Sequence, residues 1–139
     1  MVLETSSPDG RTGFLVRKVG VLSPEYSLEL VLHGVDAAQP VVTAISYTQV
    51  DGRERMLLLP VMQGQFGPPA SYVRLPGFGI DVAWTASSPS PATSDTVWDA
   101  EVVADSVRLA LNEATRDTWR QVRELVDENL RGVIDGALR

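Results

Sequence analysis

The side chain best suited to catalysis in this 139-residue sequence is its single histidine, His33. An imidazole can act as a general base, but a Ser–His–Asp arrangement also needs an activated serine, and the sequence has no Gly-x-Ser-x-Gly elbow to supply one. His33 lies at the end of a predicted strand, on its polar face. We therefore expect a solvated histidine, and we predict no catalytic residue.

Paired carboxylates are a second source of acid–base chemistry. Glu25 and Glu29 share one face of a predicted strand, but at ~3.3 Å per residue they lie roughly 13 Å apart, beyond the ~5–9.5 Å of glycosidase pairs. Asp81 follows a glycine-rich segment and can equally form a structural ion pair with Arg74. The acidic spacings match neither a calcium loop nor a metal-binding triad, and the chain has no cysteine. We therefore expect no metal site and no cofactor.

The segment 64–79 is the best candidate for a binding loop. It is rich in glycine and proline and longer than most connections, and long loops in compact domains are often functional. It carries aromatic and guanidinium groups of the kind that dominate interfaces. The predicted ligand or partner residues in and just after it are Gln65, Phe66, Tyr72, Arg74, Phe78 and Asp81. The alternative is that the two phenylalanines plug the end of a sheet.

The elements that would position these residues are strands. Residues 14–86 show alternation of apolar and polar side chains, most clearly at 25–33, where Tyr26, Leu28, Leu30 and Leu32 share one face. Asp51-Gly52 predicts a two-residue type I′ hairpin. Because no helix lies between the strands, a βαβ arrangement is excluded. We predict an α+β fold with a meander-like antiparallel sheet of about five strands.

A Ser/Pro-rich hinge at 87–94 leads into a helical segment at 95–139. As one helix at about 1.5 Å per residue this segment would extend roughly 67 Å, far beyond a globule with a radius of gyration near ~14 Å. Its apolar stripe also changes face near 115–118. We therefore predict a long C-terminal helix or helix pair with a break or change of face there.

From Trp119 onward the apolar residues form a second stripe on this changed face. This stripe needs burial, and apolar patches of this size usually mark interfaces. Its predicted interface residues are Trp119, Val122, Val126, Leu130, Val133 and Ile134. We accordingly predict a homo-oligomer or a complex with a protein partner, formed through the C-terminal helix. A chain truncated at Thr115 should then be a soluble monomer with its sheet intact.

Composition limits the partners further. The net charge of −6 and the pI near 4.7 disfavour nucleic acids and anionic lipid surfaces. Residues 1–13 are polar, without the apolar stretch of a signal peptide, and no apolar run reaches the length of a membrane span. We expect a flexible N-terminus and a single cytoplasmic domain at 14–139.

The predicted function is a non-catalytic protein–protein interaction module. One alternative is a small-ligand-binding domain or an enzyme with its site at 64–79. Another is an acidic inhibitor, immunity or chaperone-like protein that masks a basic partner. The order of elements, an antiparallel sheet followed by a C-terminal helix in an acidic chain, is similar in outline to the SecB export chaperone, a likeness of fold that does not carry function.

Overall fold

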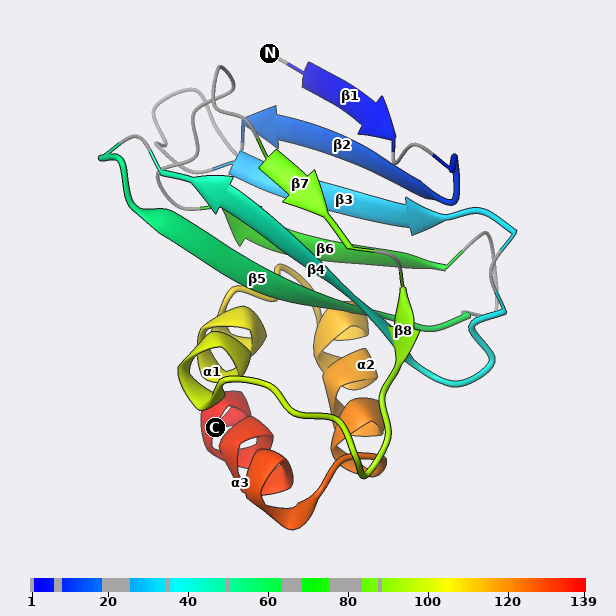
Figure 1. Ribbon diagram of the computed structural model, residues 1–139, viewed down its shortest axis with the longest axis vertical. Coiled ribbons are helices and arrows are strands. Elements are labelled where there is room, and N and C mark those ends of the chain that lie inside the picture. The colour runs from blue at the N-terminus through cyan, green and yellow to red at the C-terminus, as the bar shows by residue number, and fades with distance from the viewer. Residues whose placement is uncertain are drawn as a thin grey trace.

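The computed structural model describes residues 2–6, 9–18, 26–34, 36–49, 51–63, 69–75, 84–87 and 89–139. A strand-rich half is followed by three C-terminal helices (Figure 1), which confirms the predicted α+β class. The strands are β1 (Val2–Ser6), β2 (Thr12–Lys18), β3 (Tyr26–Leu32), β4 (Val41–Thr48), β5 (Glu54–Val61), β6 (Ala70–Leu75), β7 (Trp84–Ala86) and β8 (Ser90–Pro91), and the helices are α1 (Ala100–Arg108), α2 (Glu113–Arg123) and α3 (Glu128–Leu138).

The strands form two antiparallel sheets rather than one. The first, sheet A, has the order β1-β2-β3-β6, and the second, sheet B, has the order β5-β4-β7, with β8 pairing to the other end of β4. The chain leaves sheet A after β3, forms the β4–β5 hairpin in sheet B, and returns to sheet A as β6. The arrangement is therefore not a simple meander. The sequence could not predict this, because alternation defines the faces of a strand but not its neighbours.

Two strands lie where none was predicted. β1 falls inside the N-terminal stretch expected to be flexible, and it pairs with β2 along its whole length. β8 falls inside the Ser/Pro-rich hinge, with Pro91 opposite Val41. β1 has five residues that do not alternate regularly between apolar and polar. β8 has two residues, neither of them β-branched or aromatic, so it lacks the composition by which strands are recognised.

The β4–β5 hairpin is confirmed, but its turn is not the predicted type. The Gln49 N–H donates to the Arg53 carbonyl at 2.7 Å, so the connection is one residue longer than expected. Among the described residues only glycines have positive φ, and Gly52 has φ 89°. A type I′ turn would require positive φ at Asp51 as well.

The two sheets pack face to face, and their inward side chains form the first core. Leu28, Leu30 and Leu32 of β3 point inward, as their alternation predicted. Ile45 of β4 and Leu57 of β5 point toward them from sheet B. Since one face of each sheet in such a pair must be buried, period-two alternation identifies the buried side correctly.

The other face of sheet B contributes to a second core, shared with the helices. Val42 of β4 and Leu58 of β5 pack there against helical side chains. In Figure 1 the three helices gather beside β5 and β6, below the two sheets. The buried helical members of this core are Val103, Val107, Trp119, Val122, Val126, Leu130, Ile134 and Ala137. The molecule therefore has two apolar cores that share sheet B.

The helical segment is broken twice, at 109–112 and at 124–127, and the predicted break at 115–118 instead lies inside α2. Each helix begins with a side chain that caps its first amides, namely Asp99, Asn112 and Asp127. Asp and Asn are among the preferred N-cap residues. The change of apolar face is thus produced by separate helices, each of which turns its own stripe toward the second core.

The first break also completes the sheets. Arg74 N–H donates to the Leu109 carbonyl and Leu111 N–H donates to the Tyr72 carbonyl, both at 2.9 Å, so the α1–α2 connection pairs with the outer edge of β6. Thr115 Oγ1 accepts the Tyr72 N–H at 3.0 Å. On β5, the Leu58 N–H donates to Ser106 Oγ at 2.9 Å. Hydroxyls from two helices therefore satisfy edge amides that would otherwise be unpaired.

The Thr115 contact can be tested by removing its hydroxyl. We expect Thr115→Val to lower the free energy of unfolding by about 1–3 kcal/mol, because the part-buried Tyr72 N–H loses its acceptor. Urea titrations measure this change.

Thr43→Val is the matched control. Thr43 Oγ1 is buried in the first core and has no hydrogen-bond partner among the described residues. Its replacement by a methyl group should leave the free energy of unfolding unchanged or raise it. If Thr115→Val is as stable as Thr43→Val, the hydroxyl of Thr115 does not stabilise the edge of β6.

Candidate functional site

The structure describes two of the predicted residues in and after the 64–79 loop. Tyr72 and Arg74 lie on β6, on the face of sheet A that points away from sheet B, where Tyr72 is half-buried and Arg74 is exposed. Tyr72 is paired across the sheet with Glu29, which in turn is paired with Leu15. Gln65, Phe66, Phe78 and Asp81 lie outside the described residues. His33 is exposed at the end of β3, as expected.

The stripe predicted to bind a partner is instead the centre of the second core. Trp119, Val122 and Ile134 are completely buried, Val126 and Leu130 are buried, and Val133 is half-buried against the same cluster. This corrects the prediction of an interface made by these six side chains. The stripe does need burial, but α1 and sheet B of the same chain provide it.

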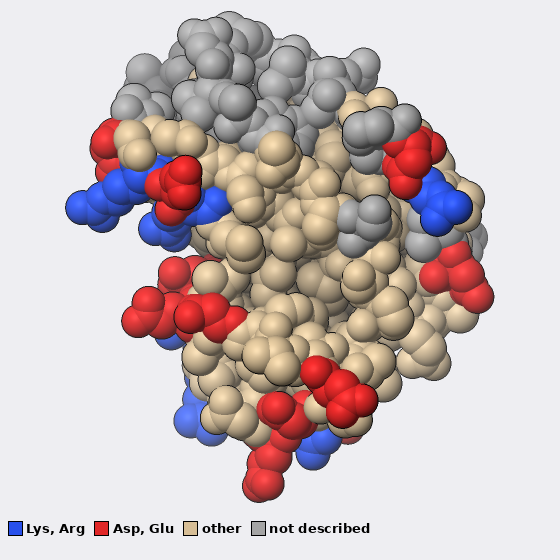
Figure 2. Space-filling model, in the orientation of Figure 1, with Lys and Arg blue, Asp and Glu red and all other residues tan. Residues whose placement is uncertain are grey.

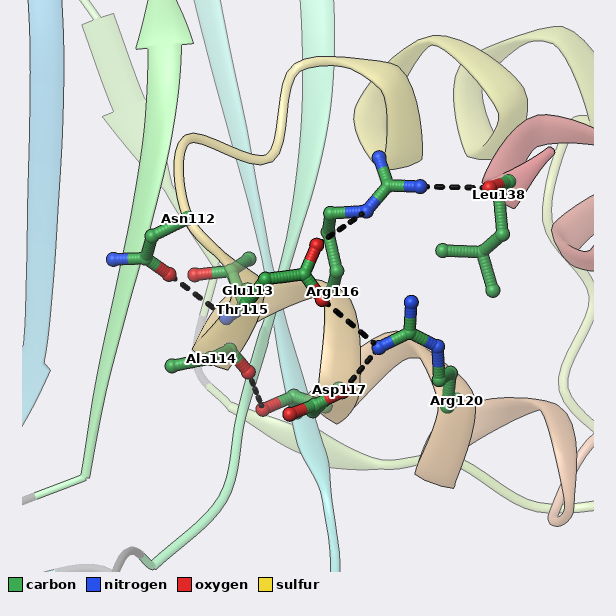
Figure 3. A network of polar contacts seen from close by, with 9 residues as sticks. Asn112, Glu113, Ala114, Thr115, Arg116, Asp117, Arg120 and Leu138 are labelled. Carbon is green, nitrogen blue, oxygen red and sulfur yellow. Dashed lines mark hydrogen bonds and ion pairs between the residues drawn. The ribbon is translucent and has the colours of Figure 1, made fainter.

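A polar network joins the start of α2 to the end of α3 (Figure 3). Arg116 Nη2 donates to the Leu138 carbonyl at 2.7 Å, and Arg116 Nε lies 3.4 Å from a carboxylate oxygen of Glu113. Arg120 in turn contacts Glu113 and Asp117. The Arg116–Leu138 contact fastens α3 to α2. The charged groups of the network are paired with one another, so the network is structural.

A second link joins the end of α2 to the middle of α3. Arg123 forms a two-pronged contact with Asp135, with N–O distances of 2.5 and 2.9 Å. Hydrogen bonds from Arg123 lower the pKa of Asp135, so the pair is ionised at neutral pH. Arg131 Nε donates to the Arg123 carbonyl at 3.0 Å. In a continuous helix Arg123 would lie at i,i+4 spacing from Asp127. Asp127 instead caps α3 by accepting the Leu130 N–H, and Arg123 pairs with Asp135.

The outer face of sheet B is only partly covered by the helices, and a hollow of about 340 Å³ lies at its hairpin end. Its lining comes from three neighbouring strands, β4, β5 and β7. The lining residues are Ser46, Tyr47, Thr48, Glu54, Arg55, Met56 and Thr85. Burial raises the pKa of the Tyr47 phenol, which keeps this side chain neutral.

A second hollow, of about 140 Å³, continues along the same strands toward α1. It is lined by Val42, Ala44, Leu58, Ser87, Ser90, Pro91, Thr96 and Trp98. The two hollows adjoin, because Ala44 and Ser46 are alternate residues on one face of β4 and are paired with Leu58 and Met56 of β5. We call the two hollows together the sheet B trough.

The sheet B trough is rich in hydroxyl groups and carries exposed apolar side chains. Figure 2 views sheet B from outside: uncharged side chains occupy the centre, while acidic and basic side chains lie toward the margins. Met56, in its lining, is 47% exposed, and Val97, between the lining residues Thr96 and Trp98, is 91% exposed. They are the large apolar side chains that the described part of the chain exposes.

A third hollow, of about 660 Å³, lies between α1 and α3. Small residues dominate its lining, including Ala100 and Ala104 of α1 and Gly132 and Gly136 of α3. A Cβ atom at either glycine would meet no other atom within 4 Å, so helix packing does not require glycine there. This hollow contains neither an exposed aromatic nor an exposed thioether group, and it is a weaker candidate than the trough.

Within the described residues, no group of three or more His, Cys, Asp or Glu side chains is placed to hold a metal ion. Nor does the described part of the chain contain a helix of the length and apolarity that crossing a membrane requires. The chemistry that the trough offers is hydrogen bonding by Ser and Thr hydroxyls together with apolar contact. Such a surface is suited to binding.

Comparisons of this chain with protein-family models, with curated proteins and with solved structures found no match. The likeness in outline to the SecB export chaperone therefore gains no support from them. The trough was not predicted, because its residues come from segments that are far apart in the sequence. Asp51-Gly52 and the alternation of β4 were the available signals, and they indicate the hairpin and its outward face only.

Proposed function

We propose that this protein is a non-catalytic protein-binding module that contacts its partner through the sheet B trough. The observation that carries the proposal is the uncharged centre of this face, with Met56 and Trp98 in the trough and charged groups such as Glu54 and Arg55 at its end. Protein interfaces have the same plan, since their cores are depleted of charge and enriched in Met and aromatic residues.

The shape of the trough favours a protein over a small molecule. The larger hollow is near the lower limit of the ~300–1,000 Å³ typical of ligand pockets, and it measures about 340 Å³. Its floor consists of side chains from three adjacent strands, so a small ligand would stay in contact with solvent on one side. A second protein could cover both hollows and also the exposed Val97 beside them.

The partner in this proposal is a different protein. A homo-oligomer was predicted from the need to bury the second stripe, and that stripe is buried within the chain itself. We therefore expect the isolated protein to be a monomer by light scattering.

A charge placed in the trough tests the proposal. We expect Met56→Glu to weaken partner binding roughly tenfold or more, because an unpaired charge in an interface core loses its hydration. The readout is the amount of each protein that the immobilised chain captures from an extract of its source organism, quantified by mass spectrometry.

Gln121→Glu is the control, because Gln121 is exposed on α2, outside the trough, and the change adds the same charge. Both variants should unfold at the temperature of the unaltered protein. A partner retained equally by Met56→Glu and Gln121→Glu would show that the trough is not the binding surface.

A further inference from the structure

The helical part of the chain has more acidic groups than its own arginines neutralise. Residues 95–139 contain ten acidic and six basic residues. Ion pairs with arginine engage one half of these acids, namely Asp105, Glu113, Asp117, Glu124 and Asp135. The other half, Asp95, Asp99, Glu101, Asp127 and Glu128, are all exposed and make no ion pair with a described residue.

Two of these remaining acids, Asp95 and Asp99, lie at one end of the sheet B trough, whereas Glu101 lines the third hollow. Asp95 directly precedes the lining residue Thr96, and Asp99 directly follows the lining residue Trp98. Asp99 uses its carboxylate to cap α1, accepting the N–H groups of Glu101 and Val102 at 2.9 and 3.1 Å. Asp95 and Asp99 are thus exposed carboxylates at this end, and neither forms an ion pair with a described residue.

The opposite end of the trough is close to neutral. Its charged lining residues are Glu54 and Arg55, and the Arg55 guanidinium lies 3.8 Å from a carboxylate oxygen of Asp105. The trough is therefore polarised, with balanced charge at the hairpin end and excess negative charge at the Trp98 end. Below its uncharged centre, Figure 2 shows acidic side chains along the helical margin of this face.

We infer that the occupant of the trough is a segment of a basic protein. This inference rests on the proposed function and adds the chemistry of the partner. Uncharged side chains of the segment lie in the two hollows, and Lys or Arg side chains that follow them lie beside Asp95 and Asp99. A second copy of this chain is disfavoured, because a net charge of −6 on each molecule would place like charges together.

A set of defined peptides tests the inference. The probes are immobilised dodecapeptides with identical uncharged sequences, each ending in three Lys, three Glu or three Ser residues. We expect the unaltered protein to bind the Lys set most strongly and the Glu set least. Binding to the Lys set should fall as NaCl is raised from 50 to 500 mM, roughly the change from a ~14 to a ~4 Å screening length.

Two variants separate the inference from the proposed function. Asp95→Asn combined with Asp99→Asn, which keeps an N-cap side chain on α1, should weaken binding of the Lys set roughly threefold to tenfold, as the loss of two exposed charge pairs predicts. It should leave binding of the Ser set unchanged. Glu128→Gln, an exposed acid of α3 outside the trough, is the matched control and should bind like the unaltered protein. Met56→Glu should weaken binding of every set.

The outcomes are distinct. Equal binding of the Lys and Ser sets, or no binding of the Lys set, overturns the basic partner. So does a Lys preference that Asp95→Asn with Asp99→Asn leaves intact. If Lys binding depends on these two acids but Met56→Glu leaves all sets bound as before, the proposed use of the trough is overturned instead.

Discussion

Replacement of Trp119 by alanine is expected to lower the free energy of unfolding by about 3–5 kcal/mol, the usual cost of removing a large aromatic side chain from a core. Trp119 is completely buried among side chains of the three helices and sheet B. It also contacts Trp98 edge to face, with ring centroids 6.5 Å apart and an interplanar angle of 85°. Urea unfolding followed by far-UV circular dichroism measures the loss.

Trp119→Phe is the control for this prediction. The phenyl ring keeps most of the apolar volume, and the buried Trp119 Nε1, which has no hydrogen-bond partner among the described residues, is removed. We therefore expect Trp119→Phe to cost clearly less than Trp119→Ala. If Trp119→Ala left stability unchanged and instead dissociated an oligomer, the Trp119 side chain would belong to an interface between chains. Its placement in the second core of a single chain would then be contradicted.

The faces of the strands could be predicted from the sequence because they depend on local alternation. Leu28, Leu30 and Leu32 point inward for the same reason that their polar neighbours point outward: one side of the strand is covered and the other is not. The number of sheets could not be predicted in this way. Whether β6 pairs with β3 or with β5 depends on contacts between segments far apart in the chain, and alternation carries no information about them.

The helix breaks show how a correct pattern can be misread. Asn112 and Asp127 are typical N-cap residues, and each caps a helix in the structure. Because apolar residues continue at helical spacing on both sides of them, the segment was predicted as a long helix or a pair of helices. A continuous helix cannot turn both apolar stripes toward one core, so the second stripe was interpreted as surface left over for a partner. Once the chain turns at these caps, Trp119 and Ile134 reach the same core as Val103.

The candidate site had no local signal that the sequence could supply. The sheet B trough is built from Ser46 and Thr48 of β4, Met56 of β5 and Thr85 of β7, residues that are unremarkable individually. Only the pairing of the strands gathers them, with Ser46 opposite both Met56 and Thr85. The predicted Tyr72 and Arg74, by contrast, lie on sheet A, with the first core between them and the trough.

A chain that ends at Thr115 is expected to be insoluble or unfolded, contrary to the expectation from the sequence of a soluble monomer. The truncation removes most of α2 and all of α3, and with them six buried side chains of the second core. These are the small Ala137 and the five larger side chains Trp119, Val122, Val126, Leu130 and Ile134. Burial of such a side chain stabilises a protein by about 1.5–3 kcal/mol. Together these losses are comparable with the ~5–15 kcal/mol that separates folded from unfolded domains.

The damage should extend beyond the helices, because α2, most of which is removed, packs on β5 of sheet B together with α1. Val42 and Leu58 would lose part of their cover, while the first core between the sheets would keep its own side chains. The measurement is the soluble fraction after expression, with size-exclusion chromatography of any soluble product. Co-expression of residues 116–139 as a separate chain should restore solubility at least in part, because α2 and α3 contact the rest of the molecule through side-chain packing and hydrogen bonds. A truncated chain that is monomeric and unfolds cooperatively on its own would mean that the two sheets form an independent domain, with the second core dispensable for folding.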